Sequence, residues 1–189
     1  MDALLLNDLV KITTGTNSSR LTNKTEKADL YTAQDLEDDL LHIEEIQVDD
    51  GKAKSVDGTR IGSEGLVVQS LISERTAMMT EQNATKGLNQ NFAYFEFNNA
   101  QIDPKYLCYM LNESEAIAAQ RYRFSQGSVI RKATPMTIRE FQIDLPSLDL
   151  QQAIGNLYGL MLSKKRITKE KSILEEKITL EKIREALNQ

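Results

Sequence analysis

Residues 147–189 read SLDLQQAIGNLYGLMLSKKRITKEKSILEEKITLEKIREALNQ, and this stretch decides the fold. No proline follows Pro146 and no glycine follows Gly159, so no strong helix breaker interrupts the remainder. Ser147 is a residue type that caps helices, and Asp149 stands in the first turn, where the helix dipole favours an acid. We therefore predict one helix that begins near Ser147 and runs through the whole stretch.

Apolar residues recur along this helix mostly at steps of three, four and seven positions, the spacing of a coiled-coil surface. A helix of about 40 residues, at roughly 1.5 Å each, is about 60 Å long. A preceding domain of ordinary size cannot cover that length, so the uncovered apolar stripe needs a partner helix. The predicted dimer interface consists of Leu150, Ile154, Leu157, Met161, Ile167, Leu174, Ile178, Ile183 and Leu187.

Gly155 and Gly159 stand one turn apart inside the predicted helix, where each glycine costs roughly 1 kcal/mol relative to alanine. Two explanations remain open from the pattern. The pair forms a groove at which another backbone approaches closely, or it marks a frayed or kinked first turn.

The remainder, residues 1–146, predicts a mixed α/β (α+β) domain with irregular sheets, ahead of the coiled-coil helix of residues 147–189. β-branched and aromatic runs between turn residues predict strands or extended pieces in 10–14, 64–79, 89–99 and 138–146.

Two segments of this domain have helical features. Pro104 suits the first turn of a helix whose apolar spacing continues toward Phe124. Residues 31–48 are rich in acids and leucine, and they fit either a short helix or a loop that leads into a strand.

The charge balance excludes a protein that binds nucleic acid only through bulk charge. The 189-residue chain has a formal net charge of −5, with an acidic excess concentrated in residues 1–60 and a small basic excess in residues 146–189. DNA binding would therefore require a local patch. The sequence also lacks an apolar run long enough to span a membrane and a basic leader segment, and its single cysteine fits a reducing cytoplasm.

The residues of a catalytic or metal site are missing from the sequence. His42 is the only histidine, and no two Cys or His residues stand at metal-ligand spacing. The glycines of DGTRIGSEG, residues 57–65, are not followed by the Lys-Ser/Thr pair of a phosphate-binding loop. We expect no intrinsic enzyme activity, no metal and no cofactor.

Three polar and basic clusters carry side chains that suit DNA: TTGTNSSR at 13–20, ATKGLNQN at 84–91 and RYRFSQGSVIRK at 121–132. Arginine matches guanine, Asn and Gln match adenine, and Ser, Lys and Arg hold phosphates. An ordinary solvated loop explains each cluster taken singly. The first candidates for DNA contact are Arg121, Arg123, Gln126, Ser128, Arg131 and Lys132, and the second are Ser18, Ser19, Arg20, Lys86, Asn89, Gln90 and Asn91.

Four stretches in this order carry a family resemblance: LNDLVKITTG, GLVVQSLISERTAMMTEQNATKGLNQNFAYFEF, IDPKYLCYMLNES and QGSVIRKATPMTIREFQIDLPSLDLQQAIGNLY. Together they resemble the specificity subunits of type I restriction–modification systems. The last stretch is the most telling, because it joins a Gly-Ser turn, a basic segment, an exit strand and a long helix that contains glutamine.

The resemblance implies a non-catalytic subunit that reads double-stranded DNA and holds DNA adenine methyltransferase subunits and, where one is present, the restriction (nuclease or translocase) subunit. A usual member has two recognition domains and two antiparallel helices, whereas this sequence has one of each. Self-association would restore the pair and read an inverted-repeat, bipartite site. The alternative is a decoy or regulator that pairs through its helix with a full-length subunit and no longer reads DNA; the acidic balance favours that alternative.

Overall fold

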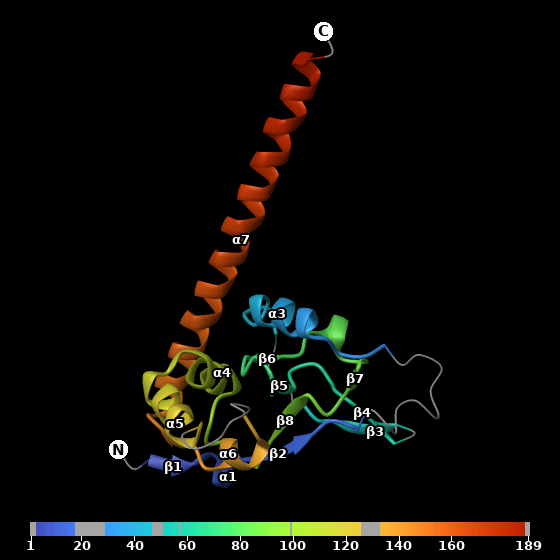
Figure 1. The fold of residues 1–189 in the computed structure, drawn as a ribbon. Coiled ribbons are helices and arrows are strands. Elements are labelled where there is room, and N and C mark those ends of the chain that lie inside the picture. Colours follow the sequence, from blue (N-terminus) through green and yellow to red (C-terminus); the bar gives the residue numbers. More distant parts are fainter. Residues whose placement is uncertain are drawn as a thin grey trace.

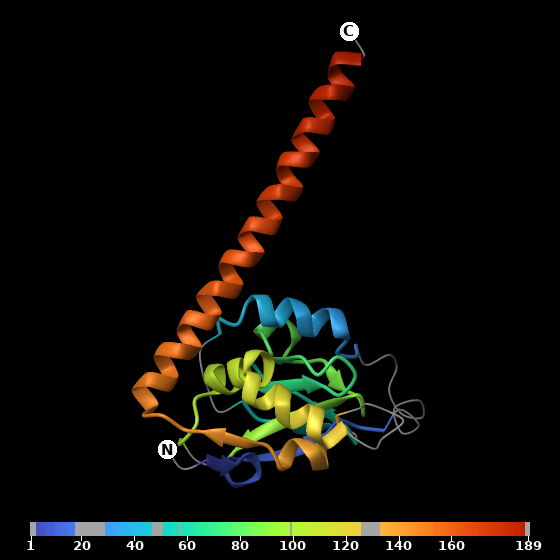
Figure 2. The same cartoon turned by 60° about the vertical axis from the view of Figure 1, so that its left-hand side comes forward.

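The computed structural model describes residues 3–17, 29–46, 51–56, 58–98, 100–125 and 133–187. An amino-terminal domain of small antiparallel sheets and helices is followed by one long helix that projects away from it (Figures 1 and 2). The predicted mixed α/β fold with a long carboxy-terminal helix is confirmed.

A four-stranded antiparallel sheet, ordered β2-β8-β5-β6, lies at the centre of the domain (Figure 1). Its strands are β2 (Val10–Thr14), β5 (Val67–Ser70), β6 (Thr76–Met78) and β8 (Phe92–Phe97). Every residue of β5 and β6 is buried, so neither strand alternates between buried and exposed positions. Val67 stands opposite Phe95, and Val10 opposite Phe97. The predicted strands in 10–14, 64–79 and 89–99 are confirmed.

Two smaller sheets flank this centre. The first has the order β3-β4-β7, and the second pairs β1 with β9. Their strands are β1 (Ala3–Leu5), β3 (Lys54–Val56), β4 (Thr59–Ile61), β7 (Gly87–Leu88) and β9 (Gln142–Asp144). Leu4 pairs with Ile143, so the amino-terminal strand lies beside the segment that leads into the long helix.

Helix α3 (Ala33–Leu41) answers the open question about residues 31–48. Thr32 and the third helical residue, Asp35, form a capping box that fixes the start of the helix. The Asp39 carboxylate is fully buried and accepts hydrogen bonds from the Tyr31 hydroxyl at 2.6 Å and the Asn83 amide at 2.8 Å. Burial raises the pKa of Asp39, although these bonds oppose the shift. The helix is thereby attached to the segment that follows β6.

The predicted helix from Pro104 to Phe124 is two helices, α4 (Pro104–Glu113) and α5 (Glu115–Ser125). Ser114 separates them because its backbone is extended, with φ −70° and ψ 123°. The remaining short elements are α1 (Leu6–Leu9), η1 (Glu81–Asn83) and α6 (Pro135–Arg139).

The extended prediction for residues 138–146 is wrong at its start. Ile138 and Arg139 belong to α6, because Thr134 caps that helix and Pro135 occupies its first turn. The strand β9 begins only at Gln142.

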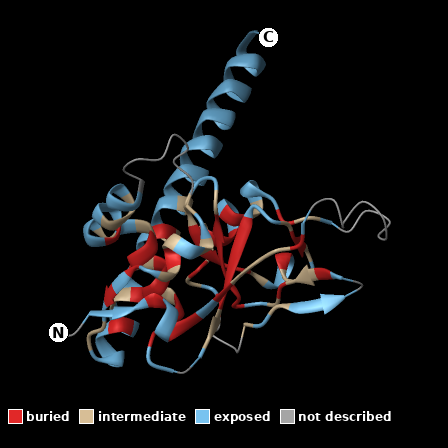
Figure 3. Cartoon of the chain, turned by 60° about the horizontal axis from the view of Figure 1, so that its bottom comes forward, coloured by how far each residue is buried: buried red, intermediate tan, exposed pale blue. Residues whose placement is uncertain are grey.

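The long helix α7 (Leu148–Leu187) has 40 residues, which corresponds to about 60 Å. Its first four turns touch the domain, and its outer part is exposed (Figure 3). The buried residues of α7 are Gln151, Gly155, Tyr158, Gly159 and Leu162. Among the described residues, no helix has the length and apolar character needed to cross a membrane.

Candidate nucleic-acid interface and helix surface

Gln151 fixes the first turn of α7 to the domain. Its side chain is 2% exposed, and its carbonyl oxygen accepts a hydrogen bond from the Asp103 backbone N–H at 2.9 Å. The amide nitrogen donates to the carbonyl oxygens of Gln101 at 3.1 Å and Pro146 at 2.9 Å. Since Asp103 also caps α4, the starts of α4 and α7 are held together by one side chain.

Gly155 and Gly159 lie where α7 approaches other backbone segments of the same chain. A Cβ atom on Gly155 would come within 2.9 Å of the Tyr106 nitrogen, and one on Gly159 within 3.3 Å of the Glu44 Cα atom. The helix is continuous through both positions. The explanation of a close backbone approach is therefore the right one, and the approaching backbone belongs to the domain itself.

Two polar contacts extend this attachment along α7. The Tyr158 hydroxyl donates to the Glu113 carboxylate and accepts from the Asn112 amide, each at 3.1 Å. Burial raises the pKa of Tyr158. Arg166 forms an ion pair with Glu45 at 2.7 Å. We call the contacts of Gln151, Gly155, Tyr158, Gly159 and Leu162 the joint; they hold α7 in one direction relative to the domain.

Most of the predicted dimer interface is exposed in the single chain. Leu157 is 67% exposed, and Leu174 is 58% exposed. The other exposed members of the predicted set are Leu150, Met161, Ile167, Ile178, Ile183 and Leu187. Ile154 differs, because it is half-buried and packs against the core of its own domain. The outer half of α7 therefore presents apolar side chains with no described segment covering them.

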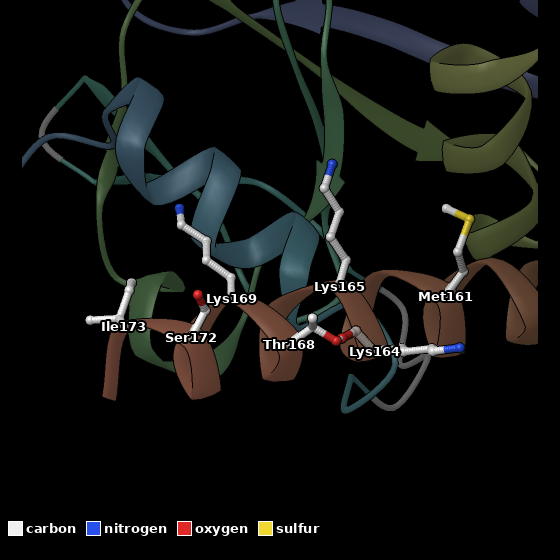
Figure 4. Close-up of a pocket in the computed structure, with 7 residues that line it drawn as sticks. All are labelled: Met161, Lys164, Lys165, Thr168, Lys169, Ser172 and Ile173. Atoms are coloured by element: carbon white, nitrogen blue, oxygen red, sulfur yellow. The ribbon is translucent and has the colours of Figure 1, made fainter. Parts of the chain in front are cut away.

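A basic cluster lies at the middle of α7, and the sequence reasoning did not single it out. Lys164, Lys165, Arg166, Lys169 and Lys171 fall within eight residues that contain one acid, Glu170. We call these five residues the mid-helix cation cluster. Three of them, Lys164, Lys165 and Lys169, border an open groove of about 540 Å³, shown in Figure 4, whose other lining residues are Met161, Thr168, Ser172 and Ile173.

Of the first candidates for DNA contact, Arg121 is bound within the domain. Its guanidinium donates to the Leu111 carbonyl at 2.7 Å, lies 3.3 Å from the Glu74 carboxylate, and stands over the Phe141 ring at 5.8 Å. Burial lowers the pKa of Arg121, although Glu74 opposes the shift. Arg123, two positions further along α5, is exposed. Gln126, Ser128, Arg131 and Lys132 lie outside the described residues.

The different surroundings of Arg121 and Arg123 predict different effects of their replacement on stability. Replacing Arg121 with alanine removes a charged hydrogen bond to a carbonyl and the pairing of Glu74, and we expect the free energy of unfolding to fall by about 2 kcal/mol. Replacing the exposed Arg123 with alanine should change it by less than about 0.5 kcal/mol. Urea denaturation of both variants measures this difference, and equal stability would contradict a structural role for Arg121.

Of the second candidates, Lys86 is half-buried and also paired within its own chain. Its ammonium lies 2.9 Å from the Asp35 carboxylate, and this bond raises the pKa of Lys86. For Asp35, burial acts to raise the pKa, but the bonds from Lys86 and Thr32 prevail and lower it. Ser18, Ser19 and Arg20 lie outside the described residues.

The turn between β7 and β8 presents the remaining candidates. Gln90 and Asn91 are exposed, and the Asn89 side chain accepts a hydrogen bond from the Asn91 backbone at 2.8 Å. Thr16 bridges to Asn89, and a Cβ atom on Gly15 would collide with the Asn89 carbonyl at 2.3 Å. The start of the polar cluster at 13–20 therefore lies against the end of the cluster at 84–91. The two segments are far apart in the sequence, so the sequence alone does not reveal this contact.

The likeness to known proteins lies in the fold. No protein-family model matches the chain, and no curated protein matches it. The crystal structure of the HsdS subunit from Thermoanaerobacter tengcongensis is similar over 90% of this chain and 39% of that one, with 14% identity and a TM-score of 0.54. The crystal structure of the type I restriction–modification system S subunit from M. genitalium is similar over 92% of this chain and 41% of that one, with 14% identity and a TM-score of 0.50.

The family resemblance seen in the sequence thus extends to the arrangement of the strands and helices. Both similar structures are larger proteins, of which this chain spans about two fifths. Over 90% of its length, the chain has the fold of a type I restriction–modification specificity (S) subunit.

Proposed function

We propose that the chain is a non-catalytic, sequence-specific DNA-binding subunit of a type I restriction–modification complex. In this proposal it forms a homodimer through α7, reads an inverted-repeat bipartite site, and docks DNA adenine methyltransferase subunits and, where one is present, a restriction subunit. The observation that carries the proposal is a helix fixed rigidly to its domain at one end and exposing apolar side chains over the rest.

The spacing of the exposed apolar residues supports an antiparallel pair with a two-fold axis. The midpoint of α7 falls between Ile167 and Thr168. Leu157 and Ile178 are equidistant from that midpoint, and so are Met161 and Leu174. When a second copy packs antiparallel, Leu157 faces Ile178 of that copy and Met161 faces its Leu174, so the surface is self-complementary. We call the surface formed by Leu157, Met161, Ile167, Leu174 and Ile178 the seam.

The same register gives the distal apolar residues a contact. Ile183 and Leu187 lie level with Gln152 and Leu148 of the second copy. Those two residues border a groove of about 1320 Å³, in which Ile46, Phe97 and Ile102 also take part. The distal end of each helix therefore meets the domain of the other copy, and the dimer holds both domains at a set separation.

For the DNA surface we retain the exposed Arg123, Gln90 and Asn91 and the half-buried Asn89, together with the candidates outside the described residues. Arginine and amide side chains are the groups that recognise base edges. The intramolecular bonds of Arg121 and Lys86 assign those two side chains to the stability of the fold.

The test is enrichment of binding sites from a pool of random duplex DNA, with the purified protein alone and with a type I DNA adenine methyltransferase subunit added. We expect an inverted repeat whose two halves have a constant spacing. Replacing Arg123 with alanine should weaken binding to that repeat about tenfold or more, since one bidentate base contact is worth about 1–3 kcal/mol. Recovery of unrelated sequences by the unchanged protein, in both settings, would contradict the proposal.

A decoy that pairs with a full-length specificity subunit is the second candidate, and the net charge of −5 favours it. Mixing the chain with such a subunit distinguishes the two. A reader of inverted repeats will form homodimers in preference to mixed dimers, whereas a decoy will form mixed dimers and recover no DNA site.

A further inference from the structure

The basic excess of α7 is concentrated in one short segment, the mid-helix cation cluster. Residues 164–171 contain 5 cations and one acid, whereas the chain as a whole has a net charge of −5. Two of the five have carboxylate partners: Arg166 pairs with Glu45 at 2.7 Å, and Lys171 lies 3.8 Å from Glu175. No carboxylate among the described residues forms an ion pair with Lys164, Lys165 or Lys169.

The proposed dimer doubles this charge at one place. The cluster straddles the midpoint of α7, between Ile167 and Thr168, so an antiparallel second copy brings its own cluster to the same level. Lys164, three positions before Ile167, lies on the seam face, so four ammonium groups without partners, those of Lys165 and Lys169 in both copies, gather within about 10 Å along the pair. Like charges at that density repel one another, which is unfavourable unless an anion lies beside them.

The direction of the side chains leaves them available to such an anion. Residues two positions apart lie on nearly opposite faces of a helix, so Lys165 and Lys169 lie away from Ile167, and only Met161, at the edge of the seam, lines the same groove. Figure 4 shows both ammonium groups pointing toward the side of α7 on which the domain lies. In the proposed dimer the DNA runs on that side as well, because the domain that would hold it lies there.

Symmetry identifies the anion. A two-fold axis that relates two copies of α7 must also relate the two half-sites that the copies read. The axis therefore passes through the middle of the helix pair and through the middle of the DNA between the half-sites. That spacer DNA is a polyanion, with one phosphate charge per roughly 1.7 Å of duplex.

We propose that Lys165 and Lys169 of both copies contact the phosphates of the spacer DNA between the two half-sites. This inference rests on the proposed function, because it needs the homodimer and its bipartite site. Phosphate contacts carry no sequence information, so the cluster contributes affinity and register without changing which bases are read. It also supplies a phosphate-binding surface to a chain whose net charge is acidic.

The experiment measures binding of the double variant Lys165→Gln, Lys169→Gln to the selected inverted repeat over a series of salt concentrations. We expect affinity to fall roughly tenfold or more and the slope of log K against log salt to decrease in size by about 2–4, since up to four phosphate contacts are lost per dimer. Preference among half-site sequences should not change.

Two control variants make the result specific. Replacing the same two lysines with arginine keeps the charge and should keep the affinity and the slope. Replacing Lys177 and Lys182 with glutamine removes equal charge from the distal part of α7 and should leave the slope within about one unit of its original value. Sedimentation of all variants as dimers shows that assembly is intact.

Neutral methylphosphonate linkages in the spacer locate the contact. They should weaken binding of the unchanged protein and have little further effect on the glutamine double variant, because both changes remove the same interaction. An unchanged salt slope in that variant, or a full and additive effect of the linkages, would overturn the inference. If the double variant keeps its DNA slope and loses a methyltransferase subunit, the cluster is a protein-binding surface and the inference is wrong. Failure of the unchanged protein to select any DNA site would instead overturn the proposed function, and this inference with it.

Discussion

A Leu174→Asp variant is expected to sediment as a single 21.4 kDa chain at concentrations where the unchanged protein sediments as a pair. The two-fold axis places each Leu174 against Met161 of the other copy, so one substitution introduces two carboxylates into the seam. A buried charge without a partner costs several kcal/mol, and two of them weaken association by a factor of about a thousand or more.

The single chain should tolerate this change. Leu174 is 58% exposed and touches no part of the domain core, so the circular dichroism spectrum and the stability of the domain should stay as they are. Thr179→Asp adds the same charge on another face of α7 and should leave the dimer intact. A Leu174→Asp variant that still sediments as a pair would show that the seam is placed wrongly.

The second large effect is expected at the joint. Gln151→Ala removes the hydrogen bonds that the Gln151 amide forms with the Asp103 N–H and with the carbonyl oxygens of Gln101 and Pro146. At about 1–3 kcal/mol for each buried polar group, the attachment of α7 should weaken by roughly 3–5 kcal/mol. Because that attachment sets the direction of the helix, the variant should accept half-sites at several spacings where the unchanged protein accepts one.

Hydrogen exchange and DNA binding measure the two parts of this prediction. In Gln151→Ala, amides in the first turns of α7 should exchange at least tenfold faster than in the unchanged protein. Gln152 is the neighbouring, exposed residue of the same type, so Gln152→Ala is the matched control for hydrogen exchange in the single chain. For half-site spacing the control is Thr179→Ala, an exposed position of α7 outside the joint, the seam and the groove beside Gln152. Protection and spacing preference in Gln151→Ala equal to those of the controls would show that Gln151 does not set the direction of α7.

The sequence predicted the long helix because its signals are local. The absence of proline after Pro146, an acid in the first turn and apolar steps of three and four all act within a few residues. The side of the helix that meets the domain is not a local property. Ile154 has the spacing of a dimer contact, yet it faces its own core, because Gly155 and Gly159 let the domain approach on that side.

The candidate DNA residues show the same limit. Arg121 and Lys86 have the composition of DNA-contacting residues, but their partners Glu74 and Asp35 lie 47 and 51 positions away in sequence. Only the fold brings those carboxylates close enough to bind them. The mid-helix cation cluster differs from these residues. Its five basic residues can be read from the sequence, but the role proposed for them depends on their position at the midpoint of α7.

Distances between spin labels on the two copies test the antiparallel pair most directly. A cysteine at Ser172 or at Glu185, both exposed, can be labelled selectively because Cys108 is buried and burial raises the pKa of its thiol. About the midpoint of α7, the two labels at position 172 should lie about 15–25 Å apart and the two at position 185 about 50–55 Å apart. Short distances at both positions would mean a parallel pair, and the absence of coupling between copies would mean that α7 does not pair with itself; either result would contradict the account.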